Sequence, residues 1–442
     1  MDFRNKIILA PMVRVSTHPF RILALKFGAD LVFTEEIIDC KLYESKRIEN
    51  VKLETVDYLG PDGNIVFRTS KEEKDKLVLQ LGTAEPEKAL KAAKHVESDV
   101  SGIDVNMGCP KDYSVKGGMG SALLRNPEKI REILETLVNG LDIAVTCKIR
   151  VLPSLEATLE LVKMIEKTGV KAITVHGRTS SCRTSHPCKI DFIQEIKNAV
   201  KIPVIANGGS KEYIKLNEDI EYFRQLTKAD SIMIARAAMW NPCIFMSSDE
   251  FQNYISKHHP DSYDLACARD YLKLALKYDH HETGIKYCLL RMLLNYSETE
   301  FYTKLTRADD IKEISNVMNI DYSEYYKEVE NPLKRFKYDL GESEVEELLN
   351  PEINNTYYDE SAVLENNYES IQDYPKQVLY FHCLKNKSKN PIYKTKFMEK
   401  KKLFYGSCEF QDCVYVSLKG YRQKRFAEQS AALVCLRKLN LT

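Results

Sequence analysis

The chain has 442 residues, enough for several domains and a large core, which excludes a peptide-sized or disordered protein. Its 64 Lys and Arg balance its 64 Asp and Glu, so the total charge predicts no particular partner. The charges are unevenly placed: residues 341–370 hold nine acidic residues and no Lys or Arg, whereas residues 371–442 hold 15 basic and five acidic residues. A nearly neutral body is therefore followed by an acidic segment and a basic tail.

The sequence carries no sign of export or membrane insertion. The first apolar run, residues 7–13, ends at Arg14 without a cleavage site, and no run approaches the ~20 apolar residues that span a bilayer. Twelve cysteines are too few for a disulfide scaffold, and their spacings do not match zinc sites, so we expect reduced thiols and no metal. These features predict a soluble, cytoplasmic protein that does not contact a membrane.

Eight short runs of β-forming residues occupy the first 240 residues, and helical spacing fills most of the intervals between them. The runs are residues 6–13, 29–36, 76–82, 102–109, 145–150, 172–178, 203–209 and 231–238. Helices are expected at residues 20–27, 86–96, 127–138, 155–168, 191–200 and 218–226. Eight β/α units in this length predict an α/β fold of the (β/α)8 TIM-barrel type, with an open, doubly wound sheet as the alternative.

After residue 263 the β-forming runs stop, and apolar residues recur at helical spacing. Residues 341–370 have no apolar periodicity and only acidic charge, which is typical of a flexible linker. Beyond Pro375 we expect a helix at 378–384, strands at 392–397, 403–410 and 414–418, and a final helix at 424–439. The predicted domains are a barrel (1–250), a small helical domain (251–340), an acidic linker (341–370) and an α-β-β-β-α domain (371–442).

The ends of the last two runs predict a phosphate site. The seventh run ends in Asn207, Gly208 and Gly209, and the eighth in Ala235 and Arg236. In a TIM barrel the active site lies at the C-terminal ends of the strands, and the loops after strands seven and eight frequently bind phosphate. Glycine lets backbone N–H groups approach phosphate oxygens, and arginine adds a charged contact. The glycine pair alone is equally typical of a tight turn, but the neighbouring arginine favours phosphate.

The other strand ends favour a flavin. No Gly-x-Gly-x-x-Gly joins a strand to a helix, so a mononucleotide fits better than a built-in dinucleotide site. Lys148 and His176 place positive charge where a reduced flavin is anionic, and Gln80 is expected to hydrogen-bond the pyrimidine edge of the ring. A surface lysine and a satisfied core histidine remain the structural alternatives. The further cofactor contacts that we expect are Pro11, Met12, Val13 and Glu35.

Cys109 ends the fourth run between a glycine and a proline, and opens a glycine-rich loop, residues 111–120, that suits a mobile lid. A lone cysteine is usually an inert core residue, but at a strand end above a cofactor site we interpret it as catalytic. Because no acidic or histidine neighbour in sequence favours a thiolate, the thiol fits a general acid at least as well as a nucleophile. The residues alone thus predict a flavin oxidoreductase with a cysteine acid.

Residues 105–110, Val-Asn-Met-Gly-Cys-Pro, with the glycine-rich residues 116–120 close behind, resemble the tRNA-dihydrouridine synthases. The motifs at residues 10–13, 147–150, 175–178 and 205–209 match that family in order and spacing, over residues 1 to about 330. The resemblance implies bound FMN, with NADPH as reductant. It implies hydride transfer from reduced FMN to C6 of a uracil while Cys109 protonates C5, with Asn106 at the uracil edge and Arg178 near the base or its phosphate.

The tail resembles a double-stranded-RNA-binding domain at Pro391, Tyr393, Ala427, Ala431 and Ala432. This narrows the family to the eukaryotic type that is thought to modify the uridine at position twenty of the tRNA D-loop. Such a domain contacts phosphates with cations at a helix N-terminus and in a loop. The expected RNA contacts are Lys400, Lys401, Lys402, Lys424 and Arg425. One phosphate contact is expected to be missing, because Glu428 replaces a usual cation.

We therefore predict a monomeric tRNA-dihydrouridine synthase that uses NADPH and FMN to reduce a D-loop uridine of tRNA. Two alternatives stay open. One is a flavin oxidoreductase for a free small molecule such as a pyrimidine, with a tail that serves another RNA. The other is an RNA-binding protein whose barrel has lost turnover, against which the joint presence of Cys109, Lys148, His176 and Arg236 argues.

Overall fold

The computed structural model describes residues 1–61, 64–182, 186–258, 262–322, 355–359, 374–398 and 403–441. The chain forms two compact units, the first ending near residue 326 and the second holding the C-terminal part. No helix within the described ranges is both long and apolar enough to cross a bilayer.

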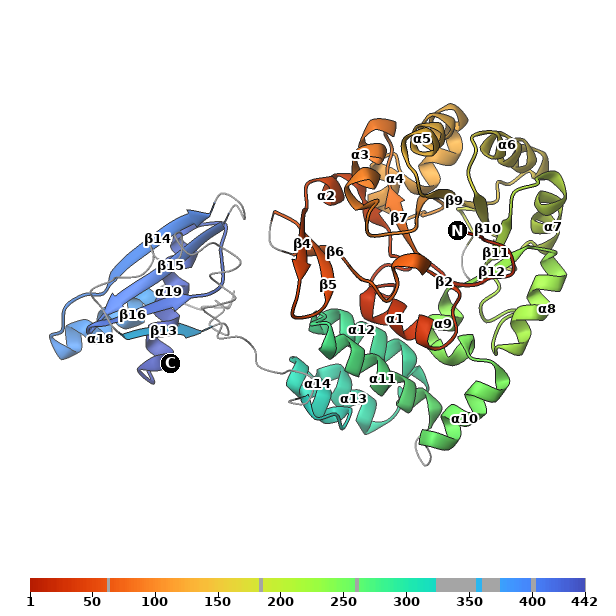
Figure 1. The fold of residues 1–442 in the computed structure, drawn as a ribbon. Helices are drawn as coiled ribbons and strands as arrows, with labels where there is room; N and C mark the ends of the chain where they lie inside the picture. The colour runs from red at the N-terminus through yellow and green to blue at the C-terminus, as the bar shows by residue number, and fades with distance from the viewer. Residues whose placement is uncertain are drawn as a thin grey trace. The chain divides into compact units, whose positions relative to one another are not determined.

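The first unit is built around a closed barrel of parallel strands (Figure 1). The strands are β1 (Ile7–Leu9), β2 (Leu31–Phe33), β7 (Leu77–Gly82), β8 (Gly102–Met107), β9 (Ala144–Arg150), β10 (Ala172–His176), β11 (Val204–Asn207) and β12 (Ser231–Ile234). Pairing of β1 with β12 and of β2 with β7 closes the ring. Each strand coincides with one of the eight predicted runs, so the TIM-barrel prediction is confirmed and the open sheet is excluded.

Helices pack on the outside of the ring, between successive strands (Figure 1). They are α1 (His18–Lys26), α3 (Pro86–Val96), α5 (Pro127–Gly140), α6 (Leu155–Lys167), α7 (Ile190–Ala199) and α8 (Glu218–Thr227). The helix α5 shows why: it buries Ile130, Ile133, Leu134 and Leu137, which recur every three to four residues and share one face. It begins at a proline, and the Asn126 side chain accepts a hydrogen bond from the Lys129 N–H.

The barrel interior has an apolar layer and a polar layer. Ile8, Leu31, Val78, Ala144, Ala172, Ile205 and Met233 belong to one buried apolar cluster. Two residues further along β7, β9, β10 and β11, on the same face because strand side chains alternate, the residues are polar, as is the residue two beyond Gly102 on β8. These buried residues are Gln80, Asp104, Thr146, Thr174 and Asn207. The polar layer therefore lies toward the C-terminal ends of the strands, where the active site was predicted.

An antiparallel sheet that the sequence analysis did not predict lies between β2 and β7. After β3 (Ile37–Ile38) and α2 (Asp39–Tyr43) come β4 (Lys46–Asn50), β5 (Thr55–Leu59), β6 (Ile65–Ser70) and the 3-10 helix η1 (Lys74–Lys76), with sheet order β4-β5-β6. Asp99 anchors this sheet, accepting a 2.7 Å bond from Arg47 Nε and a 2.5 Å bond from the Tyr58 hydroxyl. Burial and this carboxylate raise the pKa of Tyr58 above its usual range.

Helices continue the first unit after the barrel. They are α9 (Arg236–Trp240), η3 (Pro242–Phe245), α10 (Ser248–His258), α11 (Tyr263–Lys277), α12 (Glu282–Met292), η4 (Leu294–Tyr296), α13 (Glu300–Arg307) and α14 (Ile311–Val317). The contact with the barrel includes Tyr271 of α11, which is fully buried and meets Phe20 of α1 edge to face at 5.9 Å. The helices thus share one core with the barrel.

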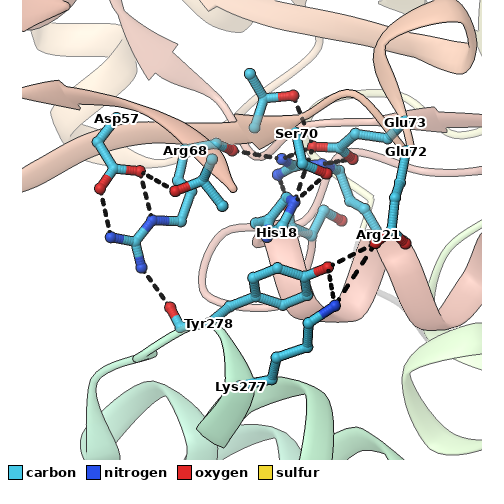
Figure 2. Close-up of polar contacts among 12 residues, drawn as sticks. His18, Arg21, Asp57, Arg68, Ser70, Glu72, Glu73, Lys277 and Tyr278 are labelled. Carbon is cyan, nitrogen blue, oxygen red and sulfur yellow. Dashed lines mark hydrogen bonds and ion pairs between the residues drawn. The ribbon is translucent and has the colours of Figure 1, made fainter. Parts of the chain in front are cut away.

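A polar network joins α1, the antiparallel sheet and the end of α11 (Figure 2). Arg68 forms two 2.6 Å bonds to Asp57 and also donates to the backbone carbonyl of Tyr278. Burial acts to raise the pKa of Asp57, but the bonds and charge of Arg68 outweigh it and hold that pKa below its usual range. Beside this pair, buried Arg21 binds Glu73 through two bonds of 2.7 and 2.8 Å. Arg21 thus ties α1 to the segment after β6, and Arg68 reaches the end of α11 through the Tyr278 carbonyl.

The second unit contains α18 (Pro375–Asn386), β14 (Ile392–Met398), β15 (Leu403–Phe410), β16 (Cys413–Ser417) and α19 (Lys424–Lys438). This order confirms the predicted α-β-β-β-α fold. One strand is additional: β13 (Asn355–Asp359) pairs in parallel with β16, inside the segment predicted as a flexible linker. Tyr357 of β13 stacks on Tyr415 at 5.5 Å, and Asp359 pairs with Arg437 at 3.2 Å. The rest of the predicted linker lies outside the described residues.

Candidate active site

A cavity of about 210 Å³ opens at the C-terminal ends of the barrel strands. It is lined by Ala10, Pro11, Lys148, Arg150, His176, Arg178, Cys182, Asn207, Gly208, Ser210, Ala235 and Arg236. Four of these residues are Lys or Arg, and no carboxylate lines the cavity within the described residues. The cavity therefore suits an anionic ligand.

The cavity gathers most, but not all, of the predicted cofactor residues. Present are Pro11, Lys148, His176, Asn207, Gly208, Ala235 and Arg236, together with Arg178 from the predicted substrate set. Outside the described lining are Met12, Val13, Glu35, Gln80, Gly209, Asn106 and Cys109. Val13 is 49% exposed, and Glu35 accepts a 2.9 Å bond from the Arg14 N–H while burial raises its pKa.

The turn at Gly208 requires glycine. Its φ is +118°, and a Cβ there would lie 2.8 Å from the His176 ring. Arg178, 3% exposed, holds this turn from behind, since Nη1 donates to the Gly208 carbonyl at 2.5 Å and Nη2 to Glu212 at 2.9 Å. The structure therefore gives Arg178 contacts within the loop, in addition to its place in the lining.

The two predicted cations at the strand ends differ in charge. Burial, with help from Arg150, lowers the pKa of Lys148 to about 8, while the charge of Asp104 opposes the fall. Burial and the neighbouring Lys148 lower the pKa of His176 well below its usual value. At neutral pH the lysine is mostly protonated and the histidine is neutral. Lys148 is thus the charged group of this pair, and His176 is a neutral hydrogen-bonding group.

The loop that carries Cys109 is fixed from several sides. The Asn106 side-chain oxygen accepts the backbone N–H groups of Gly108 and Cys109, both at 3.0 Å. On the other side the Ser121 N–H donates to the Cys109 carbonyl at 2.9 Å. Gly120, at φ +57°, passes so close that a Cβ would lie 2.6 Å from that carbonyl. The predicted lid includes α4 (Asp112–Lys116) and leads into η2 (Gly120–Arg125).

The two predicted amide contacts are largely used inside the barrel. Gln80 Nε2 donates to Asp104 at 2.8 Å, and Asn106 Nδ2 donates to the Gln80 side-chain oxygen at 3.2 Å. Each amide keeps one further N–H. Gln80 and Asn106 are 2% and 7% exposed, so both amides are buried in the polar layer of the barrel.

Arg150 is a site residue that the sequence analysis did not select. Its Nε donates to the Gly108 carbonyl at 2.9 Å and its Nη1 to the Thr179 carbonyl at 3.1 Å. It therefore ties the Cys109 loop to the loop after β10 while lining the cavity. The available signal was its position two residues after Lys148 on one strand, which puts both side chains on the same face.

In the second unit, Lys424 and Arg425 are exposed at the start of α19. Glu428, one turn further on, accepts a 2.5 Å bond from Lys376 of α18, so its carboxylate is paired within the domain. The predicted contacts Lys400, Lys401 and Lys402 lie outside the described residues.

Residues 8–318 match the family model of the dihydrouridine synthases. The chain belongs to the dihydrouridine synthase family. Residues 375–439 of this synthase-family chain also match the double-stranded RNA binding motif. Within the described residues, no group of three or more His, Cys, Asp or Glu is arranged to hold a metal ion.

Two relatives carry the name tRNA-dihydrouridine(20) synthase (NAD(P)+). The one from Schizosaccharomyces pombe is 34% identical over 333 residues, which cover 73% of this chain and 66% of the relative, just under two thirds. The one from Saccharomyces cerevisiae is 37% identical over 334 residues, covering 72% and 84%. Among solved structures, a mutant RNA-binding domain of human tRNA-dihydrouridine(20) synthase is 28% identical to this chain over the matched residues. The match covers 20% of this chain and 90% of the solved domain, with a TM-score of 0.19.

Proposed function

We propose that this chain is an NADPH-dependent tRNA-dihydrouridine synthase that carries FMN and reduces the C5–C6 double bond of a D-loop uridine, at position twenty. The observation that carries the proposal is the cationic cavity at the strand ends of a barrel that belongs to this family, with no carboxylate among the described lining residues. The names of the yeast relatives support the substrate and the nicotinamide reductant. A single barrel lines the cavity, so the proposal needs only a monomer.

The residues present fit FMN. Gly208 leaves room that a Cβ would fill, and the described part of the lining offers cations for a phosphate without an opposing carboxylate. We assign the phosphate to Asn207, Gly208, Gly209, Ala235 and Arg236. Lys148 and His176 lie on neighbouring strands and are assigned to the polar edge of the ring, with Gln80 contributing its remaining N–H. We assign the remaining cofactor contacts to Pro11, which lines the cavity, and to Met12, Val13 and Glu35, which follow the ends of β1 and β2.

When bound, FMN supplies the hydride. The chain's own task is then to orient the base and deliver a proton. We assign proton delivery to C5 of the uracil to the Cys109 thiol, whose loop is held by Asn106 and Arg150. The remaining N–H of Asn106 is available to the uracil edge. Arg178 acts on the phosphate turn through its bond to the Gly208 carbonyl.

A uridine in the folded tRNA must leave its stack to reach a cavity inside a barrel. The RNA binding motif in the second unit supplies affinity that does not depend on the base, through Lys424, Arg425 and the lysines at 400–402. Free pyrimidines remain the alternative substrate, but an RNA binding motif gives no advantage for them.

Mass spectrometry of an unmodified tRNA tests the proposal. After incubation with the full chain and NADPH, we expect two added hydrogens on one D-loop uridine, and none with the Cys109→Ala variant. An unchanged tRNA, from a protein that holds FMN and reduces free uracil, would refute the substrate and support the alternative.

A further inference from the structure

Asp104 is a buried carboxylate for which the proposed reaction has no direct use. It is 0% exposed, on β8, between Gln80 of β7 and Thr146 of β9, which are its register partners on either side. Thr146 donates to one carboxylate oxygen at 2.7 Å, and Gln80 donates to the other at 2.8 Å. Because an unpaired buried charge is costly, these two donors are what keep an ionised aspartate in the barrel.

From Asp104 a continuous series of hydrogen bonds leads to the catalytic loop. Gln80 donates to Asp104, Asn106 donates to Gln80 at 3.2 Å, and the backbone N–H groups of Gly108 and Cys109 donate to Asn106 at 3.0 Å. Every bond points the same way, toward the carboxylate. We call these four bonds the Asp104 relay.

The relay has one consistent arrangement. An ionised carboxylate only accepts, so Gln80 must turn its NH₂ toward Asp104 and its carbonyl toward Asn106. Asn106 must then turn its NH₂ toward Gln80, which leaves its carbonyl for the loop. The loop offers only backbone N–H donors there, so the two ends of the relay demand the same orientation of both amides. Hydrogen bonds in such a series also strengthen one another.

We propose that Asp104 is a positioning residue: through Gln80 and Asn106 it holds the backbone at Cys109 in the place from which the thiol reaches its substrate. The proposal rests on the proposed function, in which Cys109 gives the proton. It predicts that the acceptor at position 104 matters more than its charge. Asparagine there still offers an oxygen to Gln80, whereas leucine or alanine ends the relay at an unsatisfied amide.

Three variants and a control separate these possibilities. Asp104→Leu fills the space without an acceptor, and Asp104→Ala serves where leucine prevents folding; Asp104→Asn keeps the acceptor. The control is Thr174→Val, because Thr174 is equally buried in the same layer and its hydroxyl has no partner within the described residues. Flavin absorbance reports cofactor content in each full-length variant.

The two half-reactions are measured without oxygen: flavin reduction by NADPH, then reoxidation by saturating unmodified tRNA. With Asp104→Leu or Asp104→Ala we expect tRNA-dependent reoxidation ~10 to 100-fold slower, since a misplacement of about 1 Å costs up to ~100-fold. Reduction by NADPH should change by less than ~5-fold, because the relay reaches the flavin only through the one remaining N–H of Gln80, whereas the whole Cys109 loop depends on it. Asp104→Asn and Thr174→Val should stay within ~3-fold of the unmodified chain in both steps.

Reoxidation of the leucine and alanine variants at the normal rate would overturn the proposal. So would an asparagine variant as slow as the leucine variant, which would assign the effect to charge. Failure of the proposed function looks different: the unmodified chain itself would show no tRNA-dependent reoxidation, or Cys109→Ala would reoxidise at the normal rate.

Discussion

Asp104→Asn should make the stability of the first unit less dependent on pH. Burial raises the pKa of Asp104 to about 6 from an ordinary 3.8, against the bonds from Gln80 and Thr146 and the charge of Lys148. The pKa of Asp104 is higher in the folded state than in the unfolded state, so protonation of Asp104 favours the folded state. This stabilisation is complete below about pH 4 and is lost as pH rises through about 6. The loss amounts to about 3 kcal/mol, at 1.36 kcal/mol for each pKa unit.

Asparagine has no such titration, so the stability of the variant relative to the unmodified chain should rise by about 3 kcal/mol between pH 4 and pH 8. Denaturant unfolding followed by fluorescence measures this directly, because Trp240 of α9 is the single tryptophan and reports on the first unit. Titrating groups that do not interact with Asp104 cancel in the difference, whereas Lys148, whose pKa the charge of Asp104 raises, adds to it as pH approaches 8. Thr174→Val, which removes a neutral group at the same depth, should change stability by the same amount at every pH. A difference between Asp104→Asn and the unmodified chain that is flat with pH would refute the reasoning.

Four further predictions address the two units. Cys109→Ala should retain FMN but lose most tRNA-dependent flavin reoxidation at neutral pH, because the proton donor is gone; reoxidation at the normal rate would refute the acid role. Arg236→Ala should lose FMN on gel filtration, and a fully yellow variant would count against the phosphate site. Arg68→Met should lower the free energy of unfolding by about 3 kcal/mol, since it leaves a buried carboxylate unpaired; a loss under about 1 kcal/mol would contradict this. Exchanging Lys424 and Arg425 together for alanine should weaken tRNA binding and lower its log–log salt slope by about 2, with an unchanged slope as the refuting result.

The barrel was predictable because its strands are short, apolar and separated by amphipathic helices, so each β/α unit signals itself locally. The antiparallel sheet was not, because its strands mix β-forming residues with charges such as Arg47 and Arg68. Those charges are satisfied by Asp99 and Asp57, and only the fold brings the partners together. The strand β13 was missed for a related reason: the acidic bias of its surroundings hid Thr356, Tyr357 and Tyr358, whose pairing with β16 is visible only in three dimensions.

In the candidate site, too, some features could be predicted from the sequence and others depend on contacts that only the fold brings together. Strand-end positions follow from the fold type, so the cavity residues Lys148, His176, Gly208 and Arg236 could be selected from the sequence. What each side chain does there depends on its neighbours across strands, which sequence spacing does not reveal.

Gln80 illustrates the point. Seen alone at a strand end it is an amide facing a ligand, but its register partner on β8 is Asp104. That neighbour takes one of its two N–H groups and fixes which way the amide points. The same register places Asn106 beside Lys148, with Cys109 three residues beyond. In this barrel, strand register sets the orientation of the buried amides, and the Asn106 amide so oriented accepts the backbone N–H groups of Gly108 and Cys109.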